Sequence, residues 1–161
     1  MKTLVLCYSL EGNTKVLGEA LAQGIDAEFE RLIVKKEIKS KGFGKFIWGG
    51  RQVFMGKTPE IEEIKADIDE YDLIIVGTPV WAFTYAPAIR TLLSLGLINN
   101  KKVAFFCTHE GGPGKTIKNF VSSLDESNKF LSGIDLLNDK KDILQHRERI
   151  IEWAKGLISE S

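Results

Sequence analysis

Three short segments of the chain are nearly continuous apolar runs. They cover residues 2–8, 73–76 and 103–106, and each is soon followed by glycine or hydroxyl-bearing residues. Strands that are apolar on both faces are typical of a parallel sheet covered on both sides. Two further strands are expected at 28–34 and 130–136, where the apolar runs are interrupted.

Between these segments, apolar residues recur at the spacing of an amphipathic helix. This pattern covers residues 16–21, 89–93 and 117–121, and again Asp142 to Ile158. Strands that alternate with helices predict an α/β doubly wound sheet. The chain has 161 residues, of which 43% are hydrophobic, and contains no repeat or linker, so a single domain over residues 1–161 is expected.

The first apolar run leads directly into Ser9-Leu10-Glu11-Gly12-Asn13-Thr14, after which a helical pattern begins. Hydroxyl groups, backbone N–H groups around Gly12 and the positive end of the helix dipole can converge here on one phosphate monoester. An ordinary strand-to-helix turn, with Asn13 or Thr14 as the helix cap, fits the same residues. The loop taken alone leaves both interpretations open.

Two other loops follow apolar strands and are expected to meet the first, because ligands of open α/β sheets bind outside the carboxyl ends of the strands. The second loop, residues 77–87, contains Trp81, Phe83 and Tyr85. The third loop, residues 108–115, is rich in glycine. Aromatic and glycine-rich loops beside a phosphate site suit a flat heteroaromatic ligand that carries a single phosphate.

These loops resemble those of the flavodoxin family, specifically short flavodoxin-like proteins with Tyr-Ser-x-x-Gly-Asn-Thr and Thr-Pro-Val-Trp motifs. The resemblance covers essentially the whole chain. It implies a flavodoxin-like three-layer sandwich, a five-stranded parallel sheet in the order 2-1-3-4-5, and noncovalent FMN as the cofactor. By motif match, the FMN-binding residues would be Ser9, Leu10, Glu11, Gly12, Asn13, Thr14, Thr78, Pro79, Val80, Trp81, Ala82, Phe83, Thr108, His109, Glu110, Gly111, Gly112 and Gly114.

The chain departs from the family pattern in three respects. Glu11 stands where many flavodoxins have Thr or Ser, and its carboxylate would repel a phosphate, so we expect only its backbone to face that group. The third loop offers His109 and glycines in place of a stacking tyrosine, which would leave one flavin face open. Carrier flavodoxins are usually strongly acidic, whereas this chain has a pI near 6.7.

Three functions fit these sequence features. The chain could be an FMN-dependent NAD(P)H oxidoreductase that passes electrons from a nicotinamide cosubstrate to a quinone or small acceptor. It could instead be a one-electron carrier that serves larger redox partner proteins, or a non-catalytic flavin-binding module. The flavin ring would supply the redox chemistry, so we assign no catalytic residue.

Single aromatic and histidine residues also have two interpretations each. Trp81 would stack on the flavin or belong to the core, and stacking is favoured by its place directly after Thr-Pro-Val. Phe83 and Tyr85 would flank the ligand or anchor the loop to the next helix. His109 would donate a hydrogen bond to the ligand or be solvated.

Charge and composition limit the partners and the compartment. Lys plus Arg and Asp plus Glu both total 22, so general affinity for nucleic acid is not expected. We see no apolar run of membrane-spanning length and no signal-peptide profile, and we expect a cytoplasmic protein without membrane association. Cys7 and Cys107 are expected to be buried free thiols, and no metal site is expected. The oligomeric state is not predicted.

Opposite charges are concentrated in two successive segments. Residues 31–57 are strongly basic, with Glu37 as the only acidic residue, and residues 58–72 are strongly acidic, with Lys65 as the only basic residue. The plainest interpretation is two solvated faces that partly neutralise each other. Alternatives are an anion site for a nucleotide cosubstrate, a surface for an acidic partner, or a lip over the flavin formed by Trp48. Apolar residues between Phe43 and Phe54 also predict a helix.

Overall fold

A computed structural model describes residues 1–36, 51, 56, 58–138 and 143–159. Strands and helices alternate along the chain, as the hydrophobic pattern predicts. The strands are β1 (Thr3–Tyr8), β2 (Glu28–Leu32), β3 (Leu73–Trp81), β4 (Thr84–Tyr85), β5 (Lys102–His109) and β6 (Lys129–Leu137). The helices are α1 (Asn13–Gly24), the 3-10 turn η1 (Ile68–Glu70), α3 (Pro87–Ser94), α4 (Thr116–Ser123) and α5 (Ile143–Ser159).

The main sheet has the strand order β2-β1-β3-β5-β6, and all of these neighbours are parallel. This confirms the predicted flavodoxin-like order 2-1-3-4-5 for the five parallel strands. The prediction did not include β4, a two-residue strand that pairs antiparallel with the end of β3. β3 continues to Trp81, well past the apolar run that ends at Val76, because Gly77 to Pro79 still pair with β5 and the last two residues pair with β4.

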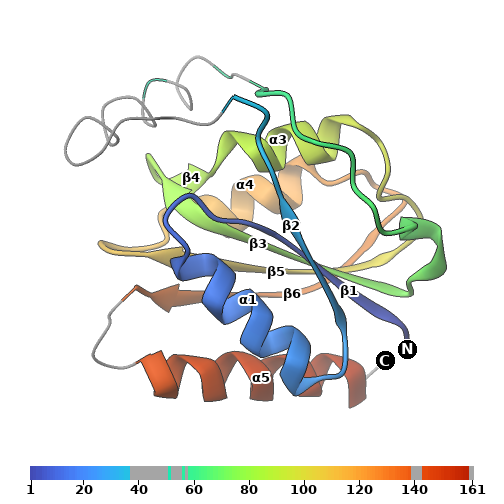
Figure 1. Ribbon diagram of the computed structural model, residues 1–161, viewed down its shortest axis with the longest axis vertical. Coiled ribbons are helices and arrows are strands. Elements are labelled where there is room, and N and C mark those ends of the chain that lie inside the picture. The colour runs from blue at the N-terminus through green and yellow to red at the C-terminus, as the bar shows by residue number, and fades with distance from the viewer. Residues whose placement is uncertain (37–50, 52–55, 57, 139–142, 160–161) are drawn as a thin grey trace.

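Helices cover both faces of the sheet and complete three layers (Figure 1), with α1 and α5 on one face and α3 and α4 on the other. Side chains alternate between the two cores, since successive strand residues point to opposite faces. Cys7 lies in the core under α1 and α5, whereas Cys107 lies in the other core. Both are free and buried, as expected, and burial raises the pKa of the Cys107 thiol to about 12.

The basic segment, residues 31–57, contacts the acidic segment, residues 58–72, through residues that the structure describes. Lys35 and Glu60 form an ion pair at 2.5 Å, and Val34 and Ile61 form an antiparallel bridge. This pair agrees with the interpretation of mutual neutralisation. The helix expected between Phe43 and Phe54, with its Trp48 lip, falls mostly outside the described residues.

Two further properties of the described residues concern membranes and metals. None of their helices has the length and apolarity needed to cross a bilayer. Within the same part of the chain, no three or more His, Cys, Asp or Glu side chains are grouped so that they could hold a metal ion.

Candidate functional site

The loops after β1, β3 and β5 meet at the carboxyl edge of the sheet and form one cleft, which encloses about 260 Å³. This volume is close to the lower end of the range for small-molecule sites, roughly 300 Å³. Most of the residues predicted to bind FMN line the cleft, namely Ser9, Leu10, Glu11, Asn13, Thr14, Pro79, Val80, Trp81, Ala82, Phe83, Thr108, His109, Glu110, Gly111 and Gly112. Asn138, which was not predicted, also lines it.

Three predicted residues do not line the cleft but support its loops. Gly12 caps α1 with a φ of 101°, a left-handed conformation that glycine adopts without strain. Thr78 Oγ1 is buried, accepts a hydrogen bond from the Ala86 N–H at 3.1 Å and donates to the Pro79 carbonyl at 3.0 Å. Gly114, with a φ of 56°, lies directly against Phe83.

The first loop, residues 9–14, gives the start of α1 features that suit an anion. The helix has no side-chain cap and no acidic residue in its first turn, so the idea that Asn13 or Thr14 caps it is wrong. The N–H groups of the first turn are therefore available to a ligand, at the positive end of the helix dipole. Ser9 Oγ accepts a hydrogen bond from the Gly12 N–H at 3.0 Å, which leaves the Ser9 hydroxyl proton for another acceptor.

Two threonine hydroxyls connect the first and third loops. Thr14 Oγ1 lies 2.8 Å from Thr108 Oγ1, and both side chains are buried. Each hydroxyl can donate one hydrogen bond and accept others, so Thr108 can donate to Thr14 while Thr14 donates into the cleft. In that arrangement the Thr14 proton would be directed to a ligand, and the contact itself holds the two loops together.

Arg31 is a supporting residue that the sequence analysis did not identify. By sequence it belongs to the basic segment, but it lies in β2 beside Cys7, and its Nη2 donates to the Ser9 carbonyl at 2.6 Å. Its Nε is buried and has no hydrogen-bond partner among the described residues. The guanidinium thus places a positive charge behind the first loop. A lone arginine on the strand next to β1 is the signal that could have pointed to it.

The second loop is a tight hairpin between β3 and β4. Trp81 is half-buried, lines the cleft and contacts Tyr8 edge to face, with ring centroids 5.8 Å apart. Tyr85 is buried, donates to Ser123 Oγ at 2.8 Å and packs edge to face on Phe120. Tyr85 therefore anchors the loop, but to α4 and not to the next helix along the chain, α3, whereas Phe83 is exposed at the cleft.

His109 fixes the third loop, so the solvated interpretation of this residue is wrong. Its side chain is only 10% exposed; Nδ1 accepts a hydrogen bond from the Gly112 N–H at 3.0 Å, and Nε2 lies 3.0 Å from Asp135 Oδ2. Because Nδ1 is an acceptor, the neutral ring carries its proton on Nε2 and donates it to Asp135. The backbone of His109 also accepts from the Asn138 N–H, at 2.6 Å. That bond brings Asn138 to the cleft from the end of β6, an edge position that the strand order itself could have indicated.

Comparison with protein families matches residues 1–131 to the NADPH-dependent FMN reductase family. The chain belongs to this family. A search of curated protein sequences finds no match.

Solved structures of other proteins have a similar fold. A protein from Bacteroides eggerthii is 20% identical, with 98% of each chain covered and a TM-score of 0.82. A flavoprotein from Lactobacillus acidophilus, crystallised in complex with FMN, is 28% identical, with 89% of this chain and 97% of that chain covered and a TM-score of 0.73. A flavodoxin, WrbA-like protein from Agrobacterium tumefaciens is 16% identical, with 99% of each chain covered and a TM-score of 0.67.

Family and fold together confirm the expected class of protein. The chain is a flavodoxin-like redox protein with FMN as its cofactor.

Proposed function

We propose that the chain is an FMN-dependent NAD(P)H oxidoreductase that reduces a quinone or another small acceptor. The observation that carries this proposal is the uneven distribution of aromatic rings around the cleft. Trp81 and Phe83 line it from the second loop, whereas the third loop contributes Thr108, His109, Glu110, Gly111 and Gly112, with no Trp, Phe or Tyr ring. A flat ring held against Trp81 would leave its other face, and the exposed Phe83 ring, to a second flat molecule.

The first loop fits the phosphate of FMN. The uncapped start of α1, the hydroxyls of Ser9 and Thr14, and the Arg31 charge behind the loop all favour a phosphate dianion there. Glu11 is exposed at the cleft, and we assign only its backbone to this site. Bound FMN supplies the hydride and electron transfer, and the chain supplies binding and orientation.

The second and third loops would orient the ring of FMN. The hydrogen bonds of Thr78 fix the path of Pro79 and Val80 along the cleft, and the contact with Tyr8 fixes the Trp81 ring. The glycines of the third loop leave room for a substrate above the ring, while His109 and Asp135 hold that loop in place. A site that is fixed before binding loses little free energy to reorganisation.

The phosphates of a nicotinamide cosubstrate require cations near the open face. The basic segment is the candidate by charge, through Lys41, Lys45, Arg51 and Lys57. Of these four, the structure describes Arg51, which is exposed. Exposed cations that steer an anionic substrate make the rate sensitive to ionic strength.

Stopped-flow reduction of the FMN-loaded protein by NADPH tests the proposal. We expect the visible flavin absorbance to be lost at a rate that saturates with NADPH and falls with added salt, and to return when menadione is added. A negligible rate with NADPH, together with rapid reduction by a reductase protein, would contradict the proposal and indicate a one-electron carrier instead.

A further inference from the structure

The turn between β3 and β4 has a backbone conformation that its residues do not favour. Ala82 and Phe83 form the two-residue loop between the paired residues Trp81 and Thr84, and their φ angles are 46° and 63°. Two positive φ values define the type I′ hairpin turn, for which Asn and Gly are the preferred residues. Phenylalanine at the second position is strained, because its Cβ crowds the backbone in the left-handed region.

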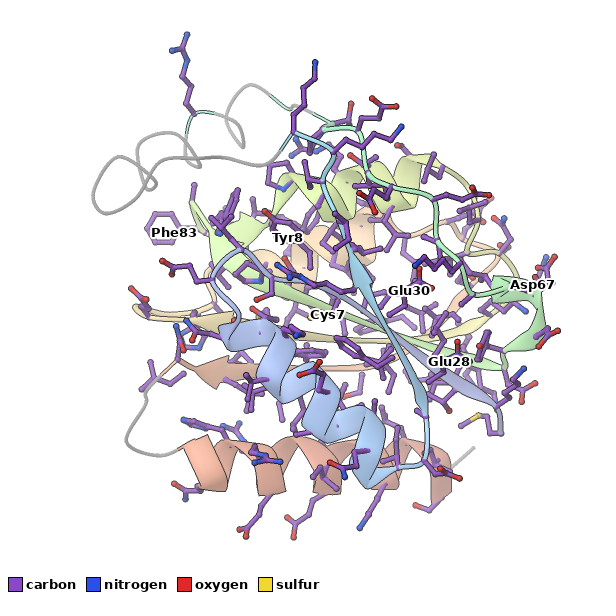
Figure 2. The ribbon with its side chains drawn as sticks, in the orientation of Figure 1. Cys7, Tyr8, Glu28, Glu30, Asp67 and Phe83 are labelled. Atoms are coloured by element: carbon purple, nitrogen blue, oxygen red, sulfur yellow. The ribbon has the colours of Figure 1, made fainter. Side chains whose placement is uncertain are left out.

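Burial does not compensate for this strain. The Phe83 side chain is 73% exposed, and Figure 2 shows it projecting from the hairpin at the edge of the molecule. The neighbouring structure fixes the backbone instead: the Phe83 carbonyl accepts from the Lys115 N–H at 3.0 Å, and a Cβ on Gly114 would lie 2.9 Å from the Phe83 Cα. A strained backbone held by its surroundings, with an exposed ring at a cleft, indicates a functional role.

We propose that Phe83 is a specificity residue for the electron acceptor, and that its ring packs on an uncharged planar acceptor such as a quinone. This inference rests on the proposed function and extends it to one side chain. Phe83 lines the cleft together with the apolar side chains of Val80 and Trp81, so a flat apolar molecule entering there would contact its ring.

Two features indicate that the ligand in contact with the Phe83 ring is an uncharged acceptor. Glu11 and Glu110 are exposed and line the same cleft, so an anionic acceptor would be repelled unless cations bind it, as proposed for the phosphates of FMN and NADPH, whereas an uncharged acceptor would not. In the proposed function FMN is held through Ser9, Thr14 and Trp81, all of which are more buried than Phe83. An exposed ring is available to a substrate that arrives after FMN is bound.

The test compares Phe83→Gly with Phe83→Tyr in the FMN-loaded protein. We measure kcat/KM for menadione relative to that for hexacyanoferrate(III), an acceptor with no planar apolar surface. Loss of one aromatic contact should lower this ratio about three- to tenfold in Phe83→Gly, and Phe83→Tyr should retain it. Leu97→Ala, at an exposed apolar residue that does not line the cleft, is the matched control and should leave the ratio unchanged.

A thermal measurement separates this role from a structural one. Glycine relieves the strain of the turn, so the melting temperature of Phe83→Gly should stay the same or rise by about 2 to 4 °C. A fall of several degrees would show that the ring stabilises the fold and would overturn the proposal.

Equilibrium binding of menadione tests the role of Phe83 even if NADPH is not the electron donor. The dissociation constant of menadione for the oxidised FMN-loaded protein should rise about three- to tenfold in Phe83→Gly, whatever the electron source. An unchanged menadione constant would overturn the proposal. Weaker FMN binding with an unchanged ratio would make Phe83 a cofactor contact, and slower reduction of cytochrome c alone would make it a protein-docking residue. Both of these outcomes also contradict the proposal.

Discussion

The first and second loops of the cleft solve the problem of a tight turn in opposite ways. The first loop has Gly12 where the backbone has a positive φ, and Ser9 is held through the Gly12 N–H and Arg31. The second loop has Ala82 and Phe83 at two positive-φ positions where glycine or asparagine would be unstrained. The first loop follows local preferences and the second contradicts them.

This difference fits the roles that we propose for the two loops. A phosphate is bound mainly by backbone N–H groups and hydroxyls, and a relaxed turn presents these well. Contact with a flat apolar substrate requires a particular side chain at a particular place, and the hairpin carries that side chain in spite of the strain.

Removal of the phosphate from the ligand should have the largest effect. Riboflavin lacks the group assigned to the first loop, so it loses several charge-assisted hydrogen bonds, each worth about 1.5 to 3 kcal/mol. We expect riboflavin to bind at least about 100-fold more weakly than FMN in titration calorimetry with the FMN-free protein. Equal affinities would remove the first loop from the binding site.

Gly114→Ala should disturb the second loop from the third. A Cβ at this position would lie 2.7 Å from the Phe83 Cβ and 2.9 Å from its carbonyl oxygen, and alanine is also strained at a φ of 56°. We expect a loss of about 2 to 3 kcal/mol in the free energy of unfolding, measured with urea. Gly111→Ala is the control, because a Cβ at Gly111 would meet no atom within 4 Å, and it should change stability little. Similar losses in both variants would disprove the close fit of Gly114 to Phe83.

Thr14→Ala should weaken the phosphate site without disturbing the hairpin. It removes a hydroxyl that lines the cleft and lies 2.8 Å from Thr108 Oγ1, and it should cost about 2 kcal/mol of FMN binding. Riboflavin binding should change much less, because the lost partner is the phosphate. If both ligands lose the same affinity, Thr14 acts through the fold and not through the phosphate.

The parts of this molecule that were predicted from sequence are those where local pattern and tertiary structure agree. Buried parallel strands must be apolar on both faces, so the pattern of apolar runs predicted the strands, whereas the strand order was implied by the resemblance to the flavodoxin family. The carboxyl edge of the sheet then located the cleft. The hairpin was missed, since Ala82 and Phe83 carry no type I′ signal and the strand continues beyond Val76. Arg31 was missed for a different reason: its contact with Ser9 joins residues that are far apart in the chain.

Ala82→Asn should relieve the strain of the hairpin while it keeps the Phe83 ring. Asparagine tolerates a positive φ and is preferred at the first position of a type I′ turn. We expect the free energy of unfolding of the FMN-free chain to rise by about 1 kcal/mol in urea denaturation. A loss of stability would show that Ala82 is not strained at this position, and the contrast between the two loops would then lose its physical basis.

Glu11→Gln should have the smallest effect, and its sign is informative. Glu11 is exposed and lines the cleft beside the proposed phosphate site, so its carboxylate opposes the phosphate through solvent. Screening keeps such an effect small, and we expect FMN to bind about 0.5 kcal/mol more tightly to the variant at low salt, with the gain fading as salt is added. Riboflavin serves as the control, because without a phosphate its affinity should not respond to this charge. Weaker FMN binding to Glu11→Gln would mean that the Glu11 carboxylate supports the first loop. The unstrained backbone of that loop would then not be enough to explain how it binds phosphate.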